Sequence, residues 1–150
     1  LQLLWNQPEV SVVLSGMSTM QQVEENIASA AVSGVGTLTE ADLALIEQVR
    51  EKYKALCPIP CTRCGYCMPC PNGVDIPHNF EVYNQGVMYD KADHSRDEYR
   101  WWIKEEARAS ACIQCRECED KCPQSILISE WMPIVHEVLG EGKPFVCTLP

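Results

Sequence analysis

Cysteines are the residues of this sequence with the clearest chemical potential, because a thiolate is both a nucleophile and a metal ligand. The chain of 150 residues contains ten of them. Eight are gathered in two short runs with gaps of two or three residues: Cys61, Cys64, Cys67 and Cys70, then Cys112, Cys115, Cys118 and Cys122. Such spacing places several thiolates on one short loop, and we therefore expect two metal-binding loops.

The second run has the spacing C-x2-C-x2-C-x3-C-P, which is typical of the [4Fe–4S] sites of bacterial ferredoxins. In that pattern the first three thiolates bind one cluster and the fourth reaches the neighbouring cluster. The first run has two residues rather than three before Cys70, but it keeps a proline, Pro71, after its last cysteine. We expect each run to contribute to a [4Fe–4S] site.

Crossed ligation assigns the cysteines of the two runs to two clusters. The first cluster is expected to use Cys61, Cys64, Cys67 and Cys122, and the second Cys112, Cys115, Cys118 and Cys70. The alternative is structural zinc, but four-cysteine zinc sites usually combine two C-x2-C pairs from separate knuckles. Two runs of four near-regular cysteines fit that arrangement poorly.

The remaining candidate ligands are isolated. Cys57 lies four residues before Cys61 and either substitutes for it or is a bystander at a helix end, and Cys147 is expected to be a free thiol. Three scattered histidines are expected at the surface or in packing. Of the adjacent Trp101 and Trp102, which cannot face the same way on a helix, we expect one in the core and the other at an interface.

Composition limits the class of partner. With 12 lysines and arginines against 21 acidic residues, the net charge is −9, which argues against nucleic acid and anionic membrane as partners and leaves a basic partner possible. Apolar residues make up 46%, enough for a core, and no stretch reaches the roughly 18 apolar residues that cross a bilayer. The start, without Met or a basic leader, indicates a piece of a longer protein, and thiolate ligands favour a reducing, cytoplasmic location.

The first segment has the pattern of a strand followed by a helix. Residues 10–14 are a β-branched run that predicts a buried strand, and Ser18 with Gln21 predicts a capping box for a helix whose inner positions include Val23 and Ile27. A single such unit cannot cover both faces of its strand. We therefore expect the last unit of an incomplete α/β domain, either poorly ordered or packed abnormally.

Helices are predicted for the rest of the chain. Thr39 and Asp42 predict the start of a helix that ends near Cys57, and Asp75 with Pro77 predicts the start of the next. Ser95 with Glu98 predicts a third. A last helix around Trp131 is stopped by Gly140, with Pro133 in its first turn. The inward positions are expected at Leu43, Ile46, Val49, Tyr53, Leu56, Phe80, either Tyr83 or Asn84, Val87, Tyr99, Trp102, Ile103, Trp131, either Ile134 or Val135, and Val138.

Taken together, these segments resemble the C-terminal part of the iron–sulfur-containing branch of the aldo/keto reductase family. The most specific stretches are residues 61–77 and 108–124, and residues 13–26 are similar to the last strand and helix of that family's (β/α)8 barrel. The resemblance implies a mainly α fold: a helical ferredoxin-like domain over 61–150, a connecting helix over 37–60, and a terminal βα unit of a truncated barrel over 1–36.

The same resemblance implies a nucleotide site at the start of the first long helix. Gly16, Ser18 and Asn26 occupy positions that hold the adenosine end of NAD(P) in the family, and helix N-termini favour phosphate. Gln22 stands where NADP-specific members have an arginine, so both NAD and NADP stay open, as does a capped amphipathic helix with no ligand. The family's catalytic tyrosine, lysine, aspartate and histidine belong to earlier barrel strands, so no catalytic residue is expected here and this fragment alone should not reduce carbonyls.

Two functions remain open from the sequence. In the first, two [4Fe–4S] clusters carry electrons for an NAD(P)-linked oxidoreductase, whose partners are the rest of the barrel and a redox protein. In the second, the clusters, or zinc, only cross-link a docking module that has no redox role.

Overall fold

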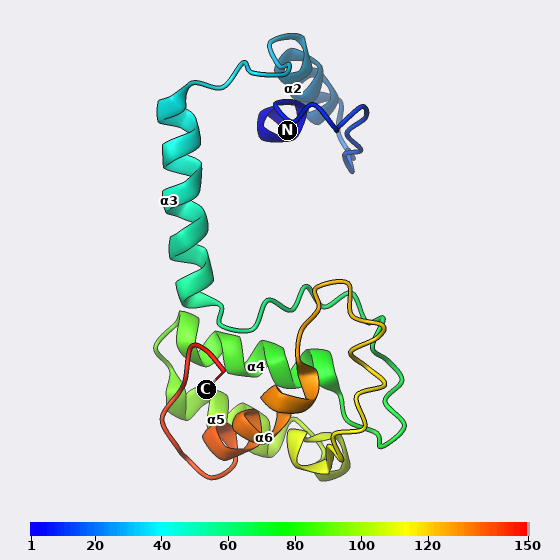
Figure 1. Cartoon of the computed structure of the whole chain (residues 1–150), viewed down its shortest axis with the longest axis vertical. Helices are drawn as coiled ribbons and strands as arrows, with labels where there is room; N and C mark the ends of the chain where they lie inside the picture. Colours follow the sequence, from blue (N-terminus) through cyan, green and yellow to red (C-terminus); the bar gives the residue numbers. More distant parts are fainter. Residues whose placement is uncertain (150) are drawn as a thin grey trace. The chain divides into compact units, whose positions relative to one another are not determined.

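The computed structural model describes residues 1–149, and helices are the only regular elements among them. The chain divides after Arg50 into two compact units, each described by itself below (Figure 1). None of the helices within residues 1–149 is both long enough and apolar enough to cross a membrane. The prediction of a mainly α fold is confirmed, whereas the terminal βα unit of a barrel is not found.

The N-terminal unit contains α1 (Gln2–Trp5), α2 (Met20–Ala31) and the first part of α3 (Glu40–Leu56). The predicted strand over 10–14 is wrong, because these residues form no regular structure and expose Val12 by 74% and Leu14 by 92%. A strand requires a neighbour that pairs with its backbone groups, and no such strand lies within residues 1–149.

The predicted α2 is present, but its capping box lies one residue later than the Ser18–Gln21 pair. The Thr19 hydroxyl accepts a hydrogen bond from the Gln22 backbone N–H at 3.3 Å, and the Gln22 side chain accepts from the Thr19 N–H at 3.2 Å. The predicted inner face is only partly confirmed, since Val23 is half-buried but Ile27 is 64% exposed. Residues 1–149 contain no sheet that could cover this face.

The start of α3 is confirmed. One Asp42 carboxylate oxygen accepts hydrogen bonds from the Thr39 hydroxyl at 2.6 Å and the Thr39 N–H at 3.0 Å, and these bonds lower the pKa of Asp42. The apolar residues of α3 that we expected to face a core are instead largely exposed: Leu43, Val49, Tyr53 and Leu56.

The C-terminal unit has the main core, formed where α4 (Ile76–Met88), α5 (Ala92–Trp101) and α6 (Ile128–Leu139) pack against one another. The Asp75 side chain caps α4 as predicted. Tyr83 lies at the centre, with Phe145 and Trp131 edge-on to its ring at 4.9 and 5.8 Å between centroids. Cysteines of both runs pack against this core: Cys61, Cys67, Cys70, Cys112, Cys118 and Cys122.

The α5 prediction is partly wrong. The helix begins at Ala92, so Ser95 lies buried within it rather than capping it. Tyr99 and Ile103 occupy the inward positions, as expected, but Trp101 and Trp102 are 76% and 79% exposed, and neither enters the core. The short 3-10 helices η1 (Glu105–Ala107) and η2 (Ala109–Ala111) then lead into the second cysteine run.

Helix α6 ends at Gly140 as predicted, but it begins at Ile128 and therefore contains Pro133 in its interior rather than in its first turn. Proline has no N–H to donate to the carbonyl four residues earlier, which is that of Ser129. The Gln114 side-chain amide donates to this carbonyl at 3.0 Å instead. A residue of the second cysteine run thus satisfies the acceptor that the proline leaves free.

Candidate metal centre

The two cysteine runs form loops with the same backbone pattern. In the first, Arg63 and Gly65 have φ angles of +58° and +77°, and in the second, Gln114 and Arg116 have +58° and +69°. These are the third and fifth residues of each run, on either side of the second cysteine. Residues in this left-handed region turn the chain sharply, and alternating right- and left-handed residues make concave sites lined by N–H groups.

Four cysteines surround a first cavity. They are Cys61, Cys64 and Cys67 from the first run, together with Cys122, the last cysteine of the second run. The apolar wall is formed by Phe80, Ile126 and Ile128, among other residues. We call this the first cavity.

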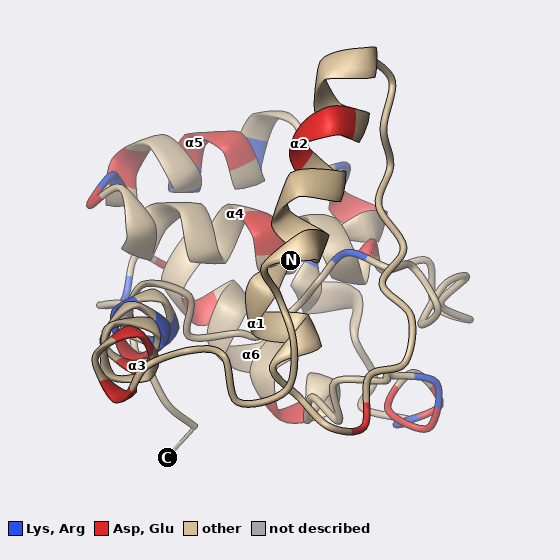
Figure 2. Cartoon of the chain, turned by 90° about the horizontal axis from the view of Figure 1, so that it is seen from above, with Lys and Arg blue, Asp and Glu red and all other residues tan. Residues whose placement is uncertain are grey.

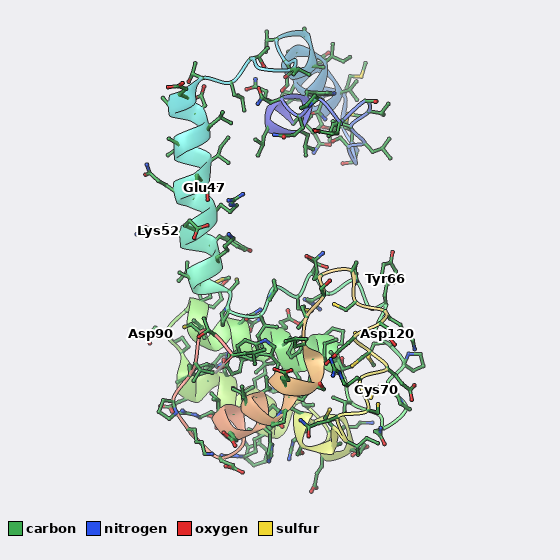
Figure 3. All side chains as sticks on the ribbon, viewed as in Figure 1. Glu47, Lys52, Tyr66, Cys70, Asp90 and Asp120 are labelled. Carbon is green, nitrogen blue, oxygen red and sulfur yellow. The ribbon has the colours of Figure 1, made fainter. Side chains whose placement is uncertain are left out.

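The other four cysteines surround a second cavity. Cys112, Cys115 and Cys118 come from the second run, and Cys70, labelled in Figure 3, comes from the first. Ile76 and Ile128 line both cavities, so a single layer of side chains separates them. The chain therefore brings the cysteines together in the two crossed sets that the spacing predicts.

Two asparagines of α4 hold the cysteine loops in place. The Asn84 side chain accepts a hydrogen bond from the Ile59 N–H at 3.1 Å and donates one to the Ile59 carbonyl at 2.7 Å. Ile59 lies just before the first run. The fully buried Asn79 donates to the Ala107 carbonyl at 2.9 Å and accepts from the Ala109 N–H at 2.9 Å, just before the second run. The sequence analysis named Asn84 only as an alternative inward residue and missed Asn79.

The second run is also fastened to the start of α6. The Glu119 carboxylate accepts from the Ser129 N–H at 2.8 Å and from the Arg116 guanidinium at 2.9 Å. With the bond from Gln114 to the Ser129 carbonyl, both backbone groups of this serine bind the loop. Glu119 is therefore a structural link between the second run and α6.

Burial raises the pKa of several thiols at the cavities. It raises the pKa of Cys118 to about 11, and it also raises the pKa of Cys61, Cys67 and Cys112. Backbone N–H groups oppose this effect, as where the Gln114 N–H donates to the Cys112 sulfur at 3.4 Å. A bound cation deprotonates such thiols, so metal uptake here must release protons.

This shift predicts a pH dependence of the metal-free protein. The pKa of Cys118 is higher in the folded chain than its ordinary value of 9.0, so folding favours the protonated thiol. The resulting stabilisation is complete below about pH 9 and is lost as the pH rises toward about 11. Urea unfolding of reduced, metal-free protein across this range should show a falling free energy of unfolding. The slope should be shallower for Cys118→Ala, and an unchanged slope in that variant would contradict the assignment.

The donor set and the cavities fit a multi-atom cluster. All the cysteines are free thiols, and those of each set line a cavity rather than converge on one point. Within residues 1–149, no three Cys, His, Asp or Glu side chains are close enough to hold a single metal ion. Cys57 and Cys147 line neither cavity.

The residues expected at a nucleotide site lie in the N-terminal unit. Ser18 donates its N–H to the Gln22 side chain at 2.8 Å, and the Asn26 amide donates to the Ser15 hydroxyl at 3.1 Å. Gly16 precedes them in the irregular segment before α2. Gln22 and Asn26 are thus engaged in local bonds at the helix start.

Comparison with protein families agrees with the geometry of the cysteine loops. Residues 60–127 match the 4Fe-4S dicluster domain. The match begins one residue before Cys61 and includes all eight cysteines of the two cavities. Comparison with curated proteins and with solved structures gives no match. The dicluster domain supports iron–sulfur cluster binding by this part of the chain.

Proposed function

We propose that the C-terminal unit binds two [4Fe–4S] clusters, one in each cavity, and transfers electrons between redox partners. The observation that carries the proposal is the crossing of the cysteine runs, since each cavity receives three cysteines from one run and one from the other. This is the ligand arrangement of two-cluster ferredoxins.

Each [4Fe–4S] cluster, when bound, stores and releases one electron. The chain's own residues would control that chemistry. The eight thiolates hold the irons, and N–H groups such as that of Gln114 donate to sulfur and stabilise its negative charge. Ile76 and Ile128 exclude water from the space between the cavities. Cys64 and Cys115 are exposed, which leaves an outer edge of each cavity open to a partner.

A second function rests on the way the cysteine sets join distant segments. Each set joins residues 61–70 to residues 112–122, so metal in either cavity would cross-link the unit. Clusters could serve only that structural purpose, and zinc could do so if the loops contracted around it.

The deciding experiment is a measurement of iron, acid-labile sulfide and zinc in protein purified without oxygen, followed by a redox titration. We expect about eight irons and eight sulfides per chain and a visible absorbance that bleaches on reduction. Clusters that no physiological donor reduces would support the structural function. Zinc at about two per chain, with no iron uptake on reconstitution, would overturn electron transfer.

The sequence resemblance extends the proposal to the parent protein. We propose that the chain belongs to a cytoplasmic aldo/keto reductase-type oxidoreductase, in which the barrel binds NAD(P) near Gly16, Ser18, Gln22 and Asn26. Because a nicotinamide transfers a hydride and a cluster one electron, a flavoprotein partner or a radical intermediate would connect them. Sequencing the message upstream of Leu1 tests this parentage, and the absence of barrel-coding sequence there would contradict it.

A further inference from the structure

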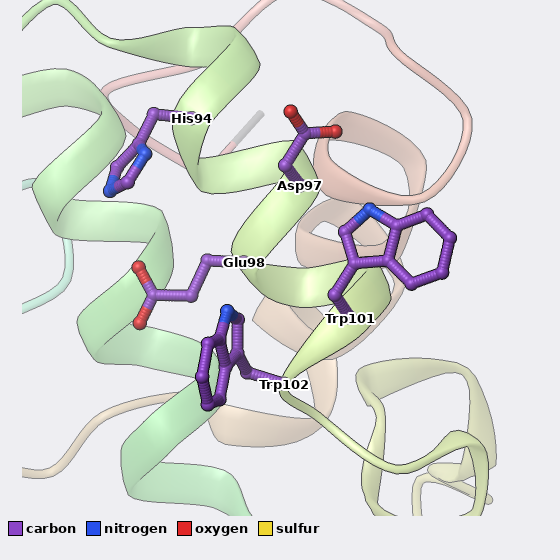
Figure 4. A pocket seen from close by; sticks show the side chains of 5 residues that line it. All are labelled: His94, Asp97, Glu98, Trp101 and Trp102. Carbon is purple, nitrogen blue, oxygen red and sulfur yellow. The ribbon is translucent and has the colours of Figure 1, made fainter.

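The outer surface of α5 has a composition that packing does not explain. His94, Asp97, Glu98 and Trp101 recur at the spacing of one helix face, and together with Trp102, the residue after α5, they line a shallow hollow (Figure 4). We call this the α5 face. It lies outside both cysteine cavities, and the proposed electron transfer assigns it no role.

The two tryptophans are the first reason to regard the α5 face as a binding surface. Their exposed fractions are 76% and 79%, and in Figure 4 their rings stand on opposite sides of the end of α5. Tryptophan carries a large apolar area that is favourable to bury, and it is among the residues that dominate protein interfaces. Two adjacent exposed indoles therefore mark a surface that a partner covers.

Charge identifies the chemistry of that partner. Asp97 lies one helical turn before Trp101 and Glu98 one turn before Trp102, and no lysine or arginine is among the described residues that line the hollow. Figure 2 shows both acidic and basic residues along α5. Arg96, a nearby arginine of α5, donates to the carbonyls of Val138, Gly142 and Lys143. Guanidinium groups stack on indole rings and pair with carboxylates, so the surface suits arginine.

We propose that the α5 face binds an arginine-rich segment of a partner protein. The indole faces would stack on guanidinium groups while Asp97 and Glu98 accept their hydrogen bonds. The chain's net charge of −9 would attract such a segment from a distance.

The α5 face lies close to the first cavity, so binding there could serve electron transfer. The His78 imidazole lies 3.7 Å from the Glu98 carboxylate, and the preceding residue, Pro77, lines the first cavity. A partner bound there would lie one helix away from the first cavity and could exchange electrons with a cluster in it. This step rests on the proposed function, whereas the binding does not.

The test uses a hexa-arginine peptide as the probe, titrated into the whole, anaerobically reconstituted chain by calorimetry. W101A/W102A and the isosteric D97N/E98Q should each weaken binding at least about tenfold. E24Q/E25Q removes the same two charges from the exposed face of α2 and should change binding less than about twofold. Unchanged circular dichroism would show that the variants fold.

Equal affinities of wild type, W101A/W102A and D97N/E98Q would overturn the proposal. An equal loss of affinity in E24Q/E25Q would also overturn the proposal, because it would show that the peptide responds only to the net charge of the chain. Iron content and reducible absorbance are measured on the same samples. Binding by protein that holds no reducible cluster would therefore contradict electron transfer while leaving the α5 face supported.

Discussion

Alanine in place of Cys122 should lower the iron content from about eight to about four per chain, although this cysteine belongs to the second run. Cys122 lines the first cavity, so its loss should disable the cluster site formed with Cys61, Cys64 and Cys67. Cys70→Ala should likewise halve the iron, through the second cavity. Iron and sulfide analysis of the anaerobically purified variants measures both effects.

Double variants test the crossing itself. Cys122→Ala combined with Cys64→Ala changes two cysteines of the same cavity and should still retain about four irons. Cys122→Ala combined with Cys115→Ala changes one cysteine of each cavity and should leave almost none. If each run instead held its own cluster, the two results would be exchanged. The matched control is Cys147→Ala, which lines neither cavity and should keep about eight irons.

Replacing Asn79 with leucine should lower the free energy of unfolding by about 2–4 kcal/mol. The change removes the acceptor of the buried Ala109 N–H, which would be left without a partner. It also removes a donor from the carbonyls of Asp75 and Ala107, although each keeps a backbone hydrogen bond. Urea unfolding of the reconstituted protein, followed by circular dichroism, measures the loss.

The control for this variant is Asn26→Leu. The Asn26 side chain bonds a serine hydroxyl at the exposed start of α2, so its replacement should change stability by less than about 0.5 kcal/mol. A loss in Asn79→Leu no larger than in the control would mean that the Asn79 bonds do not stabilise the unit. Loss of iron from the second cavity should accompany unfolding, because η2 leads directly into Cys112.

Local chemistry explains which features could be predicted from the sequence. The crossed cysteine sets follow from spacing, because a short loop can bring only some of its thiolates to one side of a cluster. The starts of α3 and α4 follow from Thr39 and Asp75, whose side chains bond backbone groups only three residues away. Such interactions need no information from the rest of the chain.

Features that depend on distant partners could not be predicted in this way. The run at residues 10–14 has the composition of a strand, but strand formation requires a second strand to pair with it. The pattern around Trp102 predicted an inward residue, but the residues buried at this end of α5 are Tyr99 and Ile103, and the Tyr99 hydroxyl bonds His136 of α6. Asn79 and Asn84 resemble ordinary helix residues until the segments that they bond are in place.

The crossed cysteine sets also give the chain an order of completion during biosynthesis. Cys118 is the last residue of the second cavity's set to be translated, and Cys122, four residues later, is the last of the first cavity's. The ribosome therefore finishes the second set before the first, although the first begins with Cys61. A nascent chain that stops before Cys112 contains the whole first run but only three of the four thiols of its cavity. Neither cavity has its four thiols before Cys118 is translated, so complete ligation of either proposed cluster must follow synthesis of most of residues 61–122.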